Sequence, residues 1–161
     1  MDEAMAGRFV GQPDFPWRQE FEGRVVGSPE FDRAWHMLGD REKMRFKDAQ
    51  RVYLQTLHVN PAMKSLKEQD DLDVSTRSFT LQQVVWALAL EVGSRVTPFH
   101  QACQALREHG KWNLNDPHFD ELLIRKTYAI LEDRHPQYRN SYEHALSTAL
   151  AQLATEQRRQ P

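Results

Sequence analysis

Apolar residues recur every three or four positions along most of the chain after Ser28, and no stretch alternates strictly between apolar and polar residues. This spacing places the apolar side chains on one face of an α-helix. The clearest example is the last apolar stripe, which consists of Tyr142, Leu146, Ala149, Leu150 and Leu153. The pattern therefore predicts an all-α fold, a single compact bundle of about six or seven helices.

Capping side chains, prolines and glycines mark the expected helix ends. Polar residues of the N-capping type stand before most of the apolar stretches, and glycine or proline follows most of them. The predicted helices run from Ser28 to Gly39, from Asp40 to Asn60, from about Ala62 to Gln69, from Thr80 to Gly93, from Thr97 to Gly110, from Asp116 to about Arg134, and from Asn140 through the final stripe.

The stretch "VVWALALEV", residues 84–92, is apolar nearly all round. A helix of that composition has no face suited to water, so we expect it at the buried centre of the fold. Thr80 and Gln83 form the pattern of a capping box just before it.

The first 27 residues differ from the rest of the chain. They hold four of the seven glycines together with Pro13 and Pro16, which argues against a long helix. Aromatic residues are nevertheless frequent there, and large rings favour burial over disorder. We therefore expect an irregular N-terminal strap (1–27) that packs on the domain or on a partner, followed by a helical domain (28–157) and a polar tail (158–161). The strap residues expected to make contacts are Phe15, Trp17 and Phe21.

Composition restricts the possible functions. The net charge is −2, whereas a dedicated nucleic-acid binder usually has a clear basic excess. The single cysteine, Cys103, excludes an internal disulfide and favours a reducing compartment, so we expect a cytoplasmic protein. No cofactor or metal motif is found in the sequence, and the longest apolar stretch is too short to cross a bilayer. We expect no cofactor, no metal and no membrane association.

The predicted helix after Asp40 has a basic face. Lys43, Lys47 and Arg51 recur every four residues and therefore lie on one side, with Arg41 and Arg45 beside them. Such a face can bind phosphates or carboxylates of a partner, or it can simply be solvated.

The hexapeptide "RNSYEH", Arg139 to His144, precedes the last stripe. It resembles the Arg-polar-x-x-x-His motif of HEPN ribonucleases, a family of small helical domains that cut RNA without a metal. The resemblance implies that Arg139 stabilises phosphate charge, that His144 transfers protons and that Asn140 orients the site.

The same stretch has a structural interpretation. Asn140 and Glu143 stand at the spacing of a capping box, which would place Asn140 at the start of the last helix. Both interpretations remain open at the level of the sequence.

A helix-turn-helix can also be aligned with "LALEVGSRVTPFHQAC", with Ala89 and Gly93 at the small-residue and turn positions. The residues that would face a DNA groove are then Thr97, His100, Gln101 and Gln104. A helix as apolar as the first one leaves little surface for the DNA backbone.

Taken together, these patterns favour a non-catalytic α-helical binding module within a larger assembly. We expect a protein partner, or the backbone of a nucleic acid, to be bound through the basic face and the aromatic strap. A HEPN-like ribonuclease is the alternative, and a DNA-binding regulator comes third.

Overall fold

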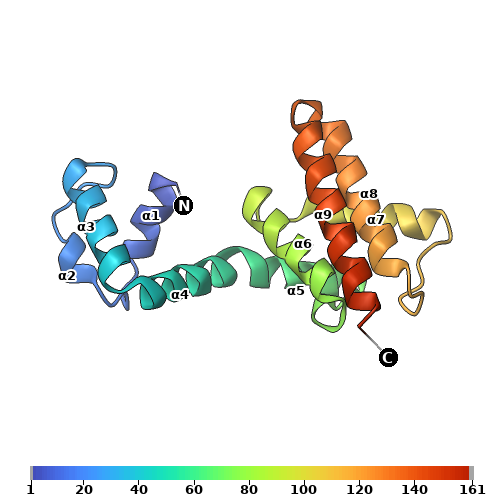
Figure 1. Cartoon of the computed structure of the whole chain (residues 1–161), viewed down its shortest axis with the longest axis horizontal. Coiled ribbons are helices and arrows are strands. Elements are labelled where there is room, and N and C mark those ends of the chain that lie inside the picture. The colour runs from blue at the N-terminus through green and yellow to red at the C-terminus, as the bar shows by residue number, and fades with distance from the viewer. Residues whose placement is uncertain (1, 160–161) are drawn as a thin grey trace. The chain divides into compact units, whose positions relative to one another are not determined.

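The computed structural model describes residues 2–159 and confirms the all-α class, because these residues contain helices and turns but no strand. The α-helices, shown in Figure 1, are α1 (Glu3–Val10), α2 (Arg18–Phe21), α3 (Pro29–Arg41), α4 (Lys43–Leu54), α5 (Asn60–Asp70), α6 (Phe79–Glu91), α7 (Thr97–Glu108), α8 (Phe119–Arg134) and α9 (Arg139–Gln157). A π-helical turn, Gln55–Val59, joins α4 to α5, and short 3₁₀ turns lie at Val74–Thr76 and Pro136–Tyr138.

The chain divides into two compact units, Met1–Leu54 and Gln55–Pro161. Each unit has its own cluster of buried apolar side chains. The division lies within a continuous run of helix. The sequence predicts a boundary at residue 27 instead, where the composition changes.

The first unit is built around aromatic rings. Phe9 lies at its centre, 5.0 Å from the ring of Phe15 and 5.2 Å from that of Tyr53. The composition of residues 1–27 predicts an irregular strap, but the segment forms α1 and α2. Asp2 explains α1, since its carboxylate accepts a hydrogen bond from the Met5 amide and caps the helix. The buried residues of this unit are Ala6, Phe9, Phe15, Trp17, Phe21, Phe31, Ala34, Leu38, Phe46 and Tyr53.

The predicted N-cap of α3 is confirmed, whereas the N-cap of α6 lies two residues before the predicted one. The Ser28 hydroxyl accepts from the Phe31 amide at the start of α3, as expected. Helix α6 begins two residues earlier than predicted, because Ser78 caps it through the Leu81 amide. Thr80 is instead buried, and its hydroxyl donates to Glu156 on α9.

Two predicted breaks do not end their helices. Helix α3 continues past Gly39 to Arg41. The chain also stays helical up to Pro61, which lies in the first turn of α5. Proline lacks an N–H and its ring crowds the carbonyl four residues earlier, so a regular α-helix cannot pass through it without distortion. The wider π-helical turn directly before α5 accommodates this change.

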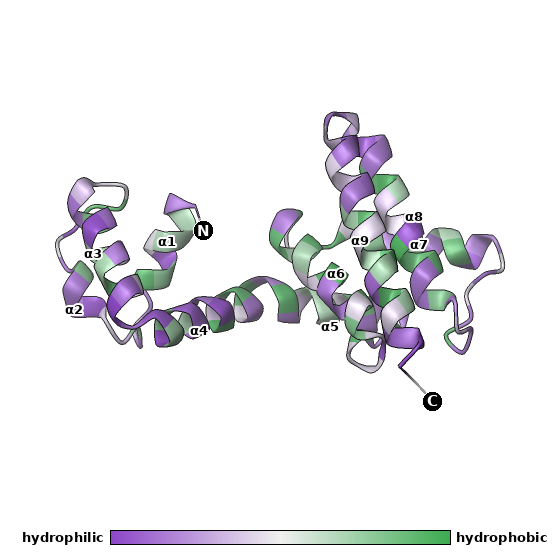
Figure 2. Cartoon of the chain, viewed as in Figure 1, coloured by the Kyte–Doolittle hydropathy of each residue, from purple (hydrophilic) through white to green (hydrophobic). Residues whose placement is uncertain are grey.

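The second unit packs around α6, as the sequence predicts. Leu81, Val85, Leu88 and Ala89 are at most 2% exposed, and the ribbon of α6 is mostly apolar in Figure 2. Helices α5, α7, α8 and α9 contribute most of the other large side chains of this core. Cys103 of α7 is fully buried, and burial together with the nearby Asp70 charge raises the pKa of its thiol to about 12.

No helix in residues 2–159 is long and apolar enough to cross a membrane. The cytoplasmic location stays a prediction.

Candidate functional site

The basic residues of α4 lie where the sequence places them, on one exposed face. Lys43, Lys47 and Arg51 follow one another at steps of about 40° around the helix axis. Three neighbouring arginines already hold carboxylates: Arg41 contacts Glu20 at 2.6 Å, Arg45 contacts Glu42 at 2.7 Å and Arg51 contacts Asp48 at 2.7 Å. Lys43 and Lys47, by contrast, form no ion pair within the described residues.

Buried Trp17 contacts two charged residues at one edge of this face, Glu42 and Arg45. Its indole N–H donates to the Glu42 carboxylate at 2.9 Å, and this hydrogen bond is the main reason why the Glu42 pKa lies below its usual range. The ionised Glu42 then holds Arg45, whose guanidinium lies 5.3 Å from the centre of the Trp17 ring. The hydrogen bond to Glu20 likewise raises the pKa of Arg41.

The three aromatic residues predicted to make contacts are buried within the first unit. Phe15, Trp17 and Phe21 are 5%, 6% and 6% exposed, and their rings pack edge to face at 5.5 and 5.7 Å. They hold α1 and α2 against α3 and α4 and offer little surface to another molecule. Their structural role in this unit is therefore to support the helix that carries the basic face.

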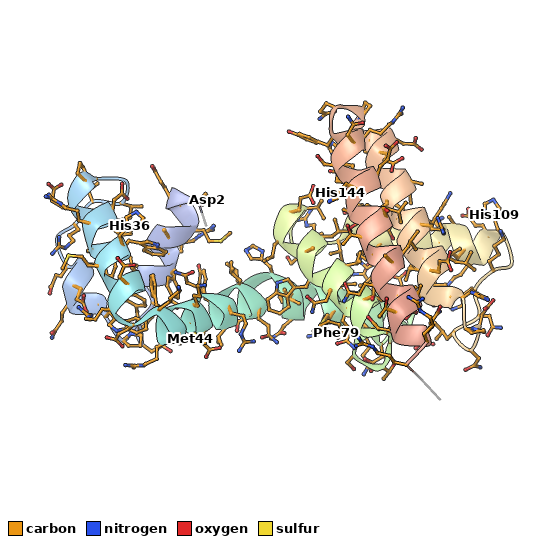
Figure 3. The ribbon with its side chains drawn as sticks, viewed as in Figure 1. Asp2, His36, Met44, Phe79, His109 and His144 are labelled. Carbon is orange, nitrogen blue, oxygen red and sulfur yellow. The ribbon has the colours of Figure 1, made fainter. Side chains whose placement is uncertain are left out.

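Apolar surface adjoins the basic face. Met44, labelled in Figure 3, is 79% exposed and lies seven residues before Arg51, so it borders the same side of α4. A hollow of about 280 Å³ lies between α3 and α4, with both free lysines on its rim. Its lining consists of Trp35, His36, Gly39, Asp40, Lys43, Phe46, Lys47 and Gln50.

Arg139 and His144 are both exposed residues in the first two turns of α9. Five positions apart on an α-helix, their side chains point in directions that differ by about 140°. Asn140 is a helical residue and no side chain caps α9. The preceding 3₁₀ turn makes such a cap unnecessary, because the Pro136 carbonyl accepts the Arg139 amide. The capping box is therefore wrong, while the resemblance to HEPN ribonucleases stays a prediction.

The residues of the helix-turn-helix alignment lie in mixed surroundings. Thr97 and Gln104 are exposed, Gln101 is half-buried, and His100 faces α5, where its ring contacts Asp70 and Ser65. Together with the burial of α6, this leaves no continuous polar face of the kind that a DNA groove requires.

The structure also has a cleft that the sequence did not predict. It measures about 560 Å³ and lies between the start of α6, the segment before α8 and the end of α9. Asp120 and Arg77 form a nearly buried ion pair in its wall, at 2.7 Å, and the exposed ring of Phe79 stands at its edge. These residues lie in a polar loop and at three helix ends, and no motif connects them in the sequence. No group of three metal-ligating side chains is found in residues 2–159.

The fold and these surfaces define a helical domain of two units that has an exposed basic and apolar face. Residues 5–156 match the family described as "Type VI secretion system spike protein VgrG3-like, C-terminal", and the chain belongs to this family. The chain is also similar to anillin of Xenopus laevis, with 28% identity over 131 residues. That alignment covers 78% of the chain but only 12% of anillin.

Proposed function

We propose that the chain is a binding module of a secretion-spike assembly and that the basic face of α4 contacts an acidic surface of a partner protein. The observation that carries the proposal is that Lys43 and Lys47, which form no ion pair in residues 2–159, lie beside exposed Met44 and the hollow between α3 and α4. The family match supports a place in such an assembly.

The composition of this face favours a protein over a nucleic acid. Guanidinium groups are well suited to phosphates, but Arg41, Arg45 and Arg51 each hold a carboxylate of this chain. An exposed methionine next to cations is suited to a partner that offers both carboxylates and apolar side chains. Phe15, Trp17 and Phe21 contribute indirectly, because they hold α4 in place.

The test is a double variant, Lys43→Gln with Lys47→Gln, in a binding assay against the spike protein of the same host at several salt concentrations. Each surface charge contributes roughly 0.2–1 kcal/mol, so affinity should fall about tenfold at low salt and less at high salt. The matched control replaces two exposed lysines of the second unit, Lys64→Gln with Lys111→Gln, and should bind like the unchanged chain.

Equal affinity of the double variant and the unchanged chain would contradict the assignment of this face. Association that disappears after nuclease treatment would show instead that the partner is a nucleic acid.

A further inference from the structure

Three polar side chains meet between α5 and α7 in an arrangement that the binding function does not use. The hydroxyl oxygen of Ser65, on α5, lies 3.0 Å from Nε2 of His100, on α7. The other ring nitrogen of His100, Nδ1, contacts a carboxylate oxygen of Asp70 at the end of α5. Each nitrogen of the imidazole therefore has a partner of this chain.

The contacts of Asp70 suit one tautomer of the His100 ring. Asp70 is 5% exposed, and Arg107 donates to its second carboxylate oxygen at 3.1 Å. The guanidinium of Arg107 is itself held 3.8 Å from the centre of the Trp112 ring. Because Arg107 donates to one oxygen of Asp70, the arrangement suits a neutral His100 that donates from Nδ1 to the other oxygen. Nε2 is then the acceptor, and the Ser65 hydroxyl donates to it.

The Ser65 hydroxyl is placed differently from the helical hydroxyls of three threonines. Thr127, Thr148 and Thr155 each donate to the carbonyl four residues earlier, as is usual in a helix. Ser65 faces an imidazole instead. Ser65 is half-buried and the His100 side chain is 20% exposed, so both residues keep part of their surface in solvent.

We propose that Ser65, His100 and Asp70 form an acyl-transfer site for small activated esters. Nε2 of His100 takes the Ser65 proton while Oγ attacks the acyl carbon, and the imidazolium then protonates the departing phenolate or thiolate. The product is an acyl ester on Ser65. Water attacks that ester in the same way, releases the carboxylic acid and restores the hydroxyl. Asp70 is a positioning residue that fixes the tautomer of His100 and stabilises the imidazolium.

The helix restricts the substrate class. Backbone amides in the middle of α5 donate to carbonyls within the helix, so they do not form an oxyanion hole for a substrate at Ser65. One such donor contributes a factor of roughly 10²–10³ in kcat. The site is therefore limited to esters with good leaving groups, such as aryl esters and thioesters, and should not cleave amides.

The experiment uses the full chain and p-nitrophenyl acetate, with release of nitrophenolate followed by stopped flow. The proposal predicts an initial burst close to one equivalent of protein and an acetyl group on the peptide that contains Ser65, detected by mass spectrometry. In Ser65→Ala the burst and the acetyl group should both be lost, and the initial rate of nitrophenolate release should fall at least about 10²-fold. Ser75→Ala is the matched control, since the Ser75 hydroxyl donates to Asp73 and has no histidine partner.

Because the chain has seven histidines, some direct ester hydrolysis by imidazole is expected, and Ser65→Ala separates the two routes. If folded Ser65→Ala reacts as fast as the unchanged chain, the proposal is overturned. If Ser65→Ala keeps the reaction while His100→Gln loses it, imidazole is the nucleophile and the serine site is equally refuted. Ser65 makes a single side-chain hydrogen bond, so Ser65→Ala should fold, and circular dichroism verifies it. Neither result depends on whether the basic face of α4 binds a partner.

Discussion

Individual polar residues fix the contacts between helices of the second unit. Arg77 contacts Asp120 through Nε at 2.8 Å and Nη2 at 2.7 Å, and the same carboxylate accepts the Ser78 amide at 2.9 Å. Their side chains are 17% and 9% exposed, so neither charge is well solvated without the other. Arg77 and Asp120 are 43 positions apart, so no local sequence pattern connects them, and the sequence did not predict this ion pair.

Asp120→Ala should lower the free energy of unfolding by about 3–5 kcal/mol, because it leaves the Arg77 guanidinium buried without its partner. Urea denaturation followed by circular dichroism measures the loss. Glu30→Ala is the control, since the Arg33–Glu30 pair is mostly solvent-exposed and should contribute less than about 1 kcal/mol. Similar losses in both variants would contradict the burial argument.

Asp73 provides a pH test at a single carboxyl. Its hydrogen bond to Lys67, at 2.6 Å, and then those from Ser75 lower its pKa from 3.8 to about 2. A folded-state pKa below the unfolded value stabilises the fold above about pH 4, and this contribution disappears as the pH falls towards 2. Lys67→Met should return the pKa towards 3.8 in an NMR titration of the carboxyl, whereas Lys64→Met should leave it unchanged. A midpoint near the ordinary value in the unchanged chain would refute the Lys67 contact.

At the scale of elements, the spacing of apolar residues located the helices better than the capping signals located their ends. The predicted helix from Thr97 to Gly110 agrees closely with α7, because Gly110 adopts φ +66°, a conformation that favours glycine. The start of α9 was misplaced because the 3₁₀ turn before it satisfies the first amide. Sequence patterns do not distinguish a side-chain cap from such a turn.

Helix α6 begins at a side-chain cap and α9 begins at a 3₁₀ turn, so substitutions at the two helix starts should differ in cost. Ser78→Ala should cost about 0.5–2 kcal/mol, since it removes the acceptor of the Leu81 amide at the start of α6. Asn140→Ala, which removes no cap, should change stability by less than about 0.5 kcal/mol. Thermal unfolding of both variants under the same conditions measures the contrast. An Asn140→Ala cost as large as that of Ser78→Ala would restore the capping box.

At the scale of the whole molecule, the all-α class was predictable but the division into two units was not. A boundary is usually sought in a stretch rich in glycine, proline or polar residues. Here the division falls between Leu54 and Gln55, where helix continues on both sides. The candidate surface was predictable in part: spacing alone placed Lys43, Lys47 and Arg51 on one face. The burial of Trp17 and the contact between Ser65 and His100 depend on tertiary packing.

A fragment that begins at Gln55 should fold by itself, because the second unit has its own core. Deleting residues 2–26 from the full chain should unfold only the first unit, since Phe9, Phe15, Trp17 and Phe21 belong to that unit's core. Two-dimensional NMR of the fragment and of the deletion variant should show the same dispersed signals for residues 60–157. Loss of dispersion in both would mean that the two cores are not independent.

Burial of the single cysteine has a practical consequence. The Cys103 side chain is fully enclosed and its thiol pKa is about 12, so an alkylating reagent meets neither an accessible sulfur nor a thiolate while α7 is in place. Covalent labelling then proceeds only from molecules in which α7 has transiently separated from its neighbours. Because the chain has one cysteine, the labelling rate reports the free energy of that local opening, next to the Ser65–His100 contact, without any engineered probe.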